Sequence, residues 1–210
     1  MLTAVLLGFV LGIRHAADPD HVAAVAALVA RHRRPGVAAW IGAAWGVGHS
    51  VTILAIGAVL VALRIAVPES LAIAAELLVA AILIALGVAN LRSLRGGAPH
   101  RHHAATHALG STAGRAFGIG IAHGLGGSAA VALLALAAVP TPQAAIVYLA
   151  VFGAGTVGGM IALSFGLGIP LALASDTPHL SRWVLGGSGA LSICAGIYLA
   201  LSTGAFPLSL

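Results

Sequence analysis

The chain has 210 residues, of which 60% are hydrophobic and only 7% are charged, and its formal net charge is +5 at pH 7. Because a soluble domain carries about 25% charged residues, this composition excludes a soluble globular protein and predicts an integral membrane protein. All ten basic residues are arginine, and the absence of lysine excludes a nucleotide-binding P-loop, whose mechanism needs a lysine on the phosphates.

Apolar runs of about 20 residues, the length that crosses a bilayer, recur along the whole chain. No basic segment precedes the first run, and a polar cluster lies where a signal peptide would be cleaved, so we interpret this run as a membrane span. The first and fifth runs are longer than a straight crossing requires, which indicates a tilt or a break. Six transmembrane helices are predicted, at residues 2–30, 37–63, 71–91, 116–139, 143–174 and 183–205.

The first span contains five ionisable groups within residues 14–21, which read Arg-His-Ala-Ala-Asp-Pro-Asp-His. A charged group at the centre of a span costs about 2.5–3.5 kcal/mol, so we expect these groups to pair with one another or to bind an ion. Arg14 and Asp18 are four residues apart and can form an ion pair on a helix. On an unbroken helix, however, Asp20 points about 140° away from His15, so one ion cannot contact the whole set.

Pro19 predicts a break in this helix, because it has no N–H to donate to the carbonyl of His15 and disfavours the α conformation at Asp18. The break can direct two imidazoles, two carboxylates and the free carbonyl toward one point. Imidazole combined with carboxylate suits a divalent transition metal such as Ni, Co, Zn, Cu or Mn, whereas Cys194, the single cysteine, excludes a cysteine-based site. A polar cluster that only fixes helix packing is the alternative.

Polar residues in the later spans are further candidates. His49 lies in the middle of the second predicted span and His123 in the fourth, and both are expected to face the ion path. A buried histidine that is hydrogen-bonded to a neighbour is the alternative for each. Glu76, in the third span, is a candidate proton carrier or partner of an arginine, and Ser128, after two glycines, is a candidate weak ligand or hinge.

The connection at residues 92–115 is predicted to be a loop rich in histidine and arginine. A histidine-rich tract can hold metal ions, and a plain solvated loop is the alternative. The histidines are His100, His102, His103 and His107.

The arginines are distributed unevenly across the membrane. Three connections on one side hold eight of them, whereas the opposite side holds only Arg64. Because positively charged loops stay in the cytoplasm, we predict that the chain lies in the cytoplasmic (inner) membrane with both termini outside, in contact with lipid and not with nucleic acid. The eight arginines are Arg31, Arg33, Arg34, Arg92, Arg95, Arg101, Arg115 and Arg182.

A short internal repeat divides the chain. Residues 12–16, Gly-Ile-Arg-His-Ala, align with residues 120–124, Gly-Ile-Ala-His-Gly, so His123 is the counterpart of His15. Three spans in each half force the halves into opposite orientations, which is a recurrent plan of secondary transporters. Chance similarity between helices rich in glycine and alanine is the alternative. The predicted organisation is one all-α transmembrane domain, residues 1–210, divided into two three-helix halves, 1–91 and 116–210, and the cytoplasmic loop 92–115.

The motif Arg14-His15-Ala16-Ala17-Asp18-Pro19-Asp20-His21 resembles the marker of the nickel/cobalt transporter (NiCoT) family, His-x4-Asp-His. The resemblance implies that His15, Asp20 and His21 recognise the metal, with Asp18 beside them. Typical members have eight spans and a later acidic signature, whereas residues 124–130 of this chain contain no carboxylate. Six spans and the Asp-Pro-Asp-His variant resemble the shorter UreH-type branch, which is associated with urease accessory genes.

These features predict a secondary permease that takes up Ni²⁺, and also Co²⁺, as transported substrate, without enzymatic activity and without a cofactor. A metallochaperone on the cytoplasmic side is a candidate partner. The candidate metal-site residues are His15, Asp18, Asp20, His21, His49 and His123, and the candidate supporting residues are Arg14, Pro19, Ser128 and Glu76.

Three alternative functions are also compatible with the sequence. The first is a metal exporter of the same fold, since the residues do not specify direction. The second is an intramembrane hydrolase that uses Ser128, although the last predicted span has no histidine to act as its base. The third is a haem-binding membrane protein with His49 and His123 as axial ligands.

Overall fold

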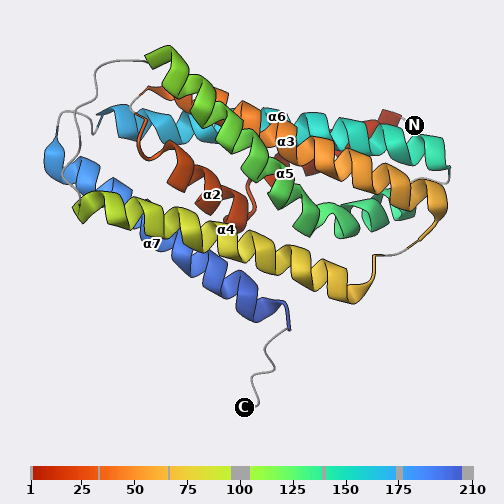
Figure 1. Ribbon diagram of the computed structural model, residues 1–210. Helices are drawn as coiled ribbons and strands as arrows, with labels where there is room; N and C mark the ends of the chain where they lie inside the picture. The colour runs from red at the N-terminus through yellow and green to blue at the C-terminus, as the bar shows by residue number, and fades with distance from the viewer. Residues whose placement is uncertain are drawn as a thin grey trace.

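The computed structural model describes residues 2–32, 34–65, 67–95, 105–138, 141–173 and 177–204. Within these ranges all regular secondary structure is helical, which confirms the predicted all-α class. The seven helices (Figure 1) are α1 (Leu2–Ala16), α2 (Pro19–Val29), α3 (Pro35–Leu63), α4 (Glu69–Arg95), α5 (Ala105–Ala138), α6 (Pro142–Leu173) and α7 (Pro178–Ser202).

The helices of the described ranges have the length and composition of a membrane protein. By these two criteria α3, α4, α6 and α7 can each cross a bilayer, and α1 and α2 are shorter apolar helices. Buried apolar side chains fill the space between the helices, with the largest cluster around Ile41, Trp45 and Met160. Many large apolar side chains also lie on the outer surface, among them Val59 and Leu71. Such a surface suits contact with lipid tails.

The predicted break in the first span is confirmed. Helix α1 ends at Ala16 and α2 begins at Pro19, because proline is favoured at the first position of a helix but not in its interior. Asp18, the residue before the proline, has an extended backbone with φ −61° and ψ 143°, as expected for a residue that precedes proline. One predicted span is therefore two helices with a non-helical joint.

The connection predicted at residues 92–115 is helical at both ends. Helix α4 continues to Arg95 and α5 begins at Ala105, so both helices extend farther than their hydrophobic runs. Residues 96–104, with His100, His102 and His103, lie outside the described residues, as does the side chain of His107.

Two groups of helices make up the bundle (Figure 1). Helix α3 packs between α5 and α6, and α1 packs on α6, whereas α4 and α7 lie side by side as a second group that touches the first through α4 and α5. Helix α2 contacts this pair as well as α3 and α6, so it lies between the two groups. The start of α2 therefore faces the interior of the bundle.

Glycines allow the backbones of the first group to touch. A Cβ atom added at Gly48 of α3 would overlap the carbonyl oxygen of Phe117 in α5, and one added at Gly120 of α5 would overlap the carbonyl oxygen of Trp45 in α3. Small residues at such crossings bring helices closer together than larger side chains permit. This close approach of α5 to α3 brings His123 near His49.

The α1–α6 crossing has the same construction. A Cβ atom added at Gly12 of α1 would overlap the carbonyl oxygen of Phe152 in α6, and one added at Gly155 of α6 would overlap the carbonyl oxygen of Phe9 in α1. The two crossings thus use glycines in matching arrangements, one between α3 and α5 and one between α1 and α6.

A buried polar cluster joins the end of α2 to α4 and α7. The side-chain amide of Asn90 donates from Nδ2 to the carbonyl of Ala27 at 2.9 Å and to Oγ of Ser188 at 3.4 Å. Its Oδ1 accepts a hydrogen bond from Nε of Arg31 at 3.1 Å, and the same guanidinium donates to the carbonyl of Ala89 at 2.8 Å. We refer to Arg31, Asn90, Ser188 and the Ala27 carbonyl as the Asn90 network.

Candidate metal centre

The joint between α1 and α2 brings four polar side chains to the interior of the bundle. His15 lies near the end of α1, Asp18 is the residue before α2, and Asp20 and His21 belong to the first turn of α2. They line a cavity of about 430 Å³ to which α3, α4 and α5 also contribute. The titratable side chains that line it are His15, Asp18, Asp20, His21, His49, Glu76 and His123.

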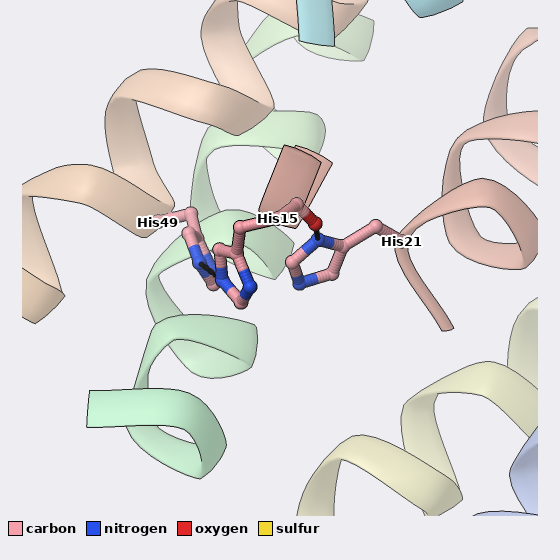
Figure 2. Close-up of side chains that lie close together, drawn as sticks. All are labelled: His15, His21 and His49. Atoms are coloured by element: carbon pink, nitrogen blue, oxygen red, sulfur yellow. Dashed lines mark hydrogen bonds between the residues drawn. The ribbon is translucent and has the colours of Figure 1, made fainter. Parts of the chain in front are cut away.

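Three imidazoles from three helices form the first group of potential ligands. The ligand atoms of His15, His21 and His49 all lie within 4.8 Å of one another, and Figure 2 shows their rings gathered in one space. His21 and His49 are buried, and His15 is partly exposed to the cavity. We refer to these residues as the three-histidine triad.

Asp18 orients the imidazole of His15. The Nδ1–H of His15 donates to Oδ2 of Asp18 at 2.7 Å. A neutral imidazole has one N–H, so Nε2 of His15 retains its lone pair, and it accepts a hydrogen bond from Nε2 of His49 at 3.1 Å. Asp18 thus acts through His15, as the carboxylate partners of metal-binding histidines do.

The carbonyl of His15 orients the imidazole of His21. Its oxygen accepts a hydrogen bond from Nδ1 of His21 at 2.7 Å and another from the backbone N–H of Asp18 at 3.0 Å. The break therefore releases this carbonyl from its usual helical partner, but the expectation that it stays free is wrong. Because Nδ1–H of His21 is used here, the Nε2 atom of His21 carries the lone pair.

A second group of potential ligands shares His21 with the first. The ligand atoms of Asp20, His21 and His123 lie within 4.8 Å of one another, and Nε2–H of His123 donates to Oδ2 of Asp20 at 2.9 Å. We refer to these three residues as the aspartate triad. The break in the helix brings Asp20 to the same cavity as His15, in spite of their separation on a regular helix.

The predicted ion pair between Arg14 and Asp18 is wrong. Asp18 is directed to the ring of His15 instead, since the helix ends between the two residues and their i,i+4 geometry is lost. Arg14 is exposed and lines a neighbouring cavity of about 280 Å³, which also touches His15 and Asp18.

Comparison with known proteins gives the family. No family model matches the chain, and no solved structure matches it. The urease accessory protein UreH of Bacillus sp. (strain TB-90) is 33% identical over 212 residues, which cover 97% of this chain and 93% of the relative. The chain belongs to the UreH family.

This kinship bears on two predictions. The resemblance to the UreH-type branch is confirmed at the level of the family. The relative is named as an accessory protein and not as an enzyme, which agrees with the prediction that the chain is not an enzyme and gives the hydrolase alternative no support. The side chain of Ser128, on which that alternative depended, lies outside the described residues.

A tryptophan of this UreH-family protein completes the wall of the centre. Trp45 is fully buried, stacks on His49 with ring centroids 4.9 Å apart and 10° between the planes, and touches the edges of His21 and His123. This contact was not predicted from the sequence, although the i,i+4 spacing of Trp45 and His49 on one helix was a signal for it.

The packing of aromatic rings around His49 and His123 argues against the haem alternative. The ring centroids of His49 and His123 are 5.9 Å apart. The ring centroids of Trp45 and His21 each lie within 5.1 Å of both of these centroids. A macrocycle between His49 and His123 would have to occupy the space of these two side chains. The geometry therefore favours a bare ion over a haem.

Three nitrogen atoms of the centre and its wall are buried without a partner. They are Nδ1 of His49, Nδ1 of His123 and the indole Nε1 of Trp45. Buried polar atoms are nearly always hydrogen-bonded, so unpaired ones need an explanation such as a missing ligand. An ion at the centre would be such a ligand, because a neutral imidazole can bind a metal through either ring nitrogen.

Glu76 lies on the wall of the same cavity. It belongs to α4, and the cavity extends beyond it to Leu199 and Ser202 at the end of α7. Ser202 is exposed, so the cavity connects the buried histidines with the surface at that end of the bundle. With Asp18 and Asp20, Glu76 makes this passage acidic, whereas Arg14 lines the neighbouring cavity.

Proposed function

We propose that this UreH-family protein is a secondary permease that takes up Ni²⁺, and Co²⁺ as a second substrate, across the cytoplasmic membrane. The observation that carries the proposal is the pair of overlapping triads, the three-histidine triad and the aspartate triad, around one cavity in an apolar helical bundle. The choice of nickel draws on the motif at residues 14–21, which resembles that of the nickel/cobalt transporters, and on the kinship with a urease accessory protein.

The chemistry of the proposed ligands fits a transition metal. His15, Asp20, His21, His49 and His123 would supply imidazole nitrogens and a carboxylate oxygen, a mixture that suits Ni²⁺ or Co²⁺. Asp18 and the carbonyl of His15 would hold two of the rings in position from outside the ligand set. Ca²⁺ would be expected to use oxygen ligands throughout.

The proposed topology is six crossings in two inverted halves, with α1 and α2 together forming the first crossing. The matching crossings support it: Gly12 meets Phe152 as Gly120 meets Trp45, and Gly155 meets Phe9 as Gly48 meets Phe117. Residues 12 and 120 are the aligned glycines of the sequence repeat. A two-fold relation between the halves explains both pairs at once.

The proposed orientation has the arginine-rich connections in the cytoplasm and both termini outside. The acidic cavity would then open outward at the end of α7, where it can receive a cation. A divalent cation that moves inward gains about 4.6 kcal/mol per 100 mV, twice the value for a single charge, so the membrane potential alone can drive uptake. A cytoplasmic metallochaperone would receive the ion.

Nickel accumulation in cells tests the proposal. Cells that express His15→Ala, Asp20→Ala or His21→Ala are expected to lose nickel accumulation, whereas His179→Ala, an exposed histidine at the start of α7, is expected to retain it. Each variant is compared at equal protein level in the membrane. Unchanged accumulation in all three would refute the permease, and a rise in cellular nickel would establish an exporter instead.

A further inference from the structure

His21 belongs to both triads, and its neutral imidazole has one nitrogen lone pair that can bind a metal ion. Its Nδ1–H is held by the carbonyl of His15 at 2.7 Å (Figure 2), so Nε2 is the single nitrogen of His21 that can ligate an ion. A lone pair binds one ion at a time. The two triads therefore cannot both be filled with His21 as a ligand.

The ring of His21 lies centrally among the other imidazoles. Its centroid is 4.5 Å from that of His15, 4.9 Å from that of His49 and 4.8 Å from that of His123. It is thus equally near to the ligands of both triads. Two divalent ions held on either side of this ring would also repel each other strongly at the low dielectric of a buried site.

The remaining ligands form two preassembled pairs. Nε2 of His15 and Nε2 of His49 are 3.1 Å apart, and Nε2 of His123 and Oδ2 of Asp20 are 2.9 Å apart. Within the described part of the chain, the mutual 4.8 Å separation holds inside each triad and not for all five side chains together. The geometry thus differs from that of one five-ligand site.

From these observations, and resting on the proposed function, we propose that the triads are two alternative sites for one divalent transition-metal ion, which passes between them while it stays bound to His21. The ion exchanges the His15–His49 pair for the Asp20–His123 pair, and the total number of bonds to the triad residues stays three. One site has three nitrogen ligands and the other has two nitrogens and one oxygen. Transport requires both sites, whereas binding requires one.

Equilibrium dialysis of the purified full-length protein against Ni²⁺ tests the shared ligand. Wild type is expected to bind one ion per chain, and the variants His49→Ala and His123→Ala are each expected to bind one ion as well. X-ray absorption of the bound nickel is expected to report two imidazoles in His49→Ala and three in His123→Ala. In cells, both variants are expected to accumulate at least tenfold less nickel than wild type.

Several results would overturn the two-site proposal. Two nickel ions per wild-type chain would show that the sites fill independently, and equal imidazole numbers in the two variants would indicate one composite site. If an alanine variant binds no nickel, His49→Gln or His123→Gln replaces it, and loss of binding at wild-type helix content by circular dichroism also overturns the proposal. Absence of nickel from wild type would instead refute the permease itself.

Discussion

Two buried polar clusters lie at opposite ends of α2, and they differ in how completely their hydrogen bonds are satisfied. In the Asn90 network, the amide of Asn90 donates to Ala27 and Ser188 and accepts from Arg31. In the histidine cluster at the start of α2, Nδ1 of His49 and Nδ1 of His123 have no partner. The amide of Asn90 thus has hydrogen-bond partners for both its donor and its acceptor atoms, whereas two imidazole nitrogens of the histidine cluster have none.

This difference agrees with a structural role for the Asn90 network and with the proposed metal binding at the histidine cluster. A closed network of hydrogen bonds fixes packing, because every polar atom already has what it needs. A cluster with unpaired buried nitrogens and an adjoining cavity of about 430 Å³ can accept a ligand. Helix α2 connects the two, so the Asn90 network holds the far end of the helix that carries Asp20 and His21.

The largest effect is expected for His21→Ala, which removes the ligand that both triads share. Nickel affinity of the purified protein is expected to fall by more than about 100-fold, beyond the range that loss of an outer partner of a ligand produces. Isothermal titration in detergent measures it, with His179→Ala as the matched control. A nickel affinity of His21→Ala within threefold of the wild-type value would contradict metal binding at the histidine cluster.

Asp18→Asn is expected to weaken nickel binding by about 10- to 100-fold, because Asp18 orients His15 from outside the ligand set. The number of bound ions and the number of imidazoles seen by X-ray absorption are expected to stay the same. Loss of an oxygen ligand from the bound nickel at an unchanged imidazole count would make Asp18 a direct ligand. The control is Glu69→Gln, an exposed carboxylate at the start of α4.

Asn90→Leu tests the structural role of the Asn90 network. The variant removes the three hydrogen bonds of Asn90 and leaves the Ala27 carbonyl without its side-chain donor, at a cost of about 1–3 kcal/mol in stability. A lower midpoint of thermal unfolding in detergent is expected, together with wild-type nickel affinity in the folded protein. Loss of affinity at unchanged stability would contradict the structural role of the Asn90 network.

The smallest effect is expected for Glu76→Gln. Removal of one negative charge from the cavity wall is expected to raise the nickel concentration for half-maximal uptake a few-fold at low ionic strength, since charged clefts concentrate counter-ions. The equilibrium affinity of the purified protein is expected to fall by a similar small factor that high salt removes. A larger loss of affinity that persists at high salt would instead make Glu76 a ligand.

Much of the architecture could be predicted from local patterns in the sequence. Long apolar runs predicted helices, and Pro19 predicted the break between α1 and α2, because a missing N–H acts within one turn of the chain. The boundaries of α4 and α5 were less well predicted, since polar residues such as Arg95 extend a helix beyond its hydrophobic part. The partner of Asp18 was predicted wrongly because the expected pair with Arg14 presupposed an intact helix.

The kinds of side chain in the first span and the place where its helix breaks could be predicted from the residues alone, since the break depends on neighbours along the chain. The partners of these side chains could not be predicted in this way. The convergence of Asp20 with His123, the hydrogen bond between His15 and His49 and the contact of His21 with Trp45 depend on helices far apart in the chain. Such contacts follow from how glycine-lined crossings set the distance between backbones, a property of the whole bundle and not of any one segment.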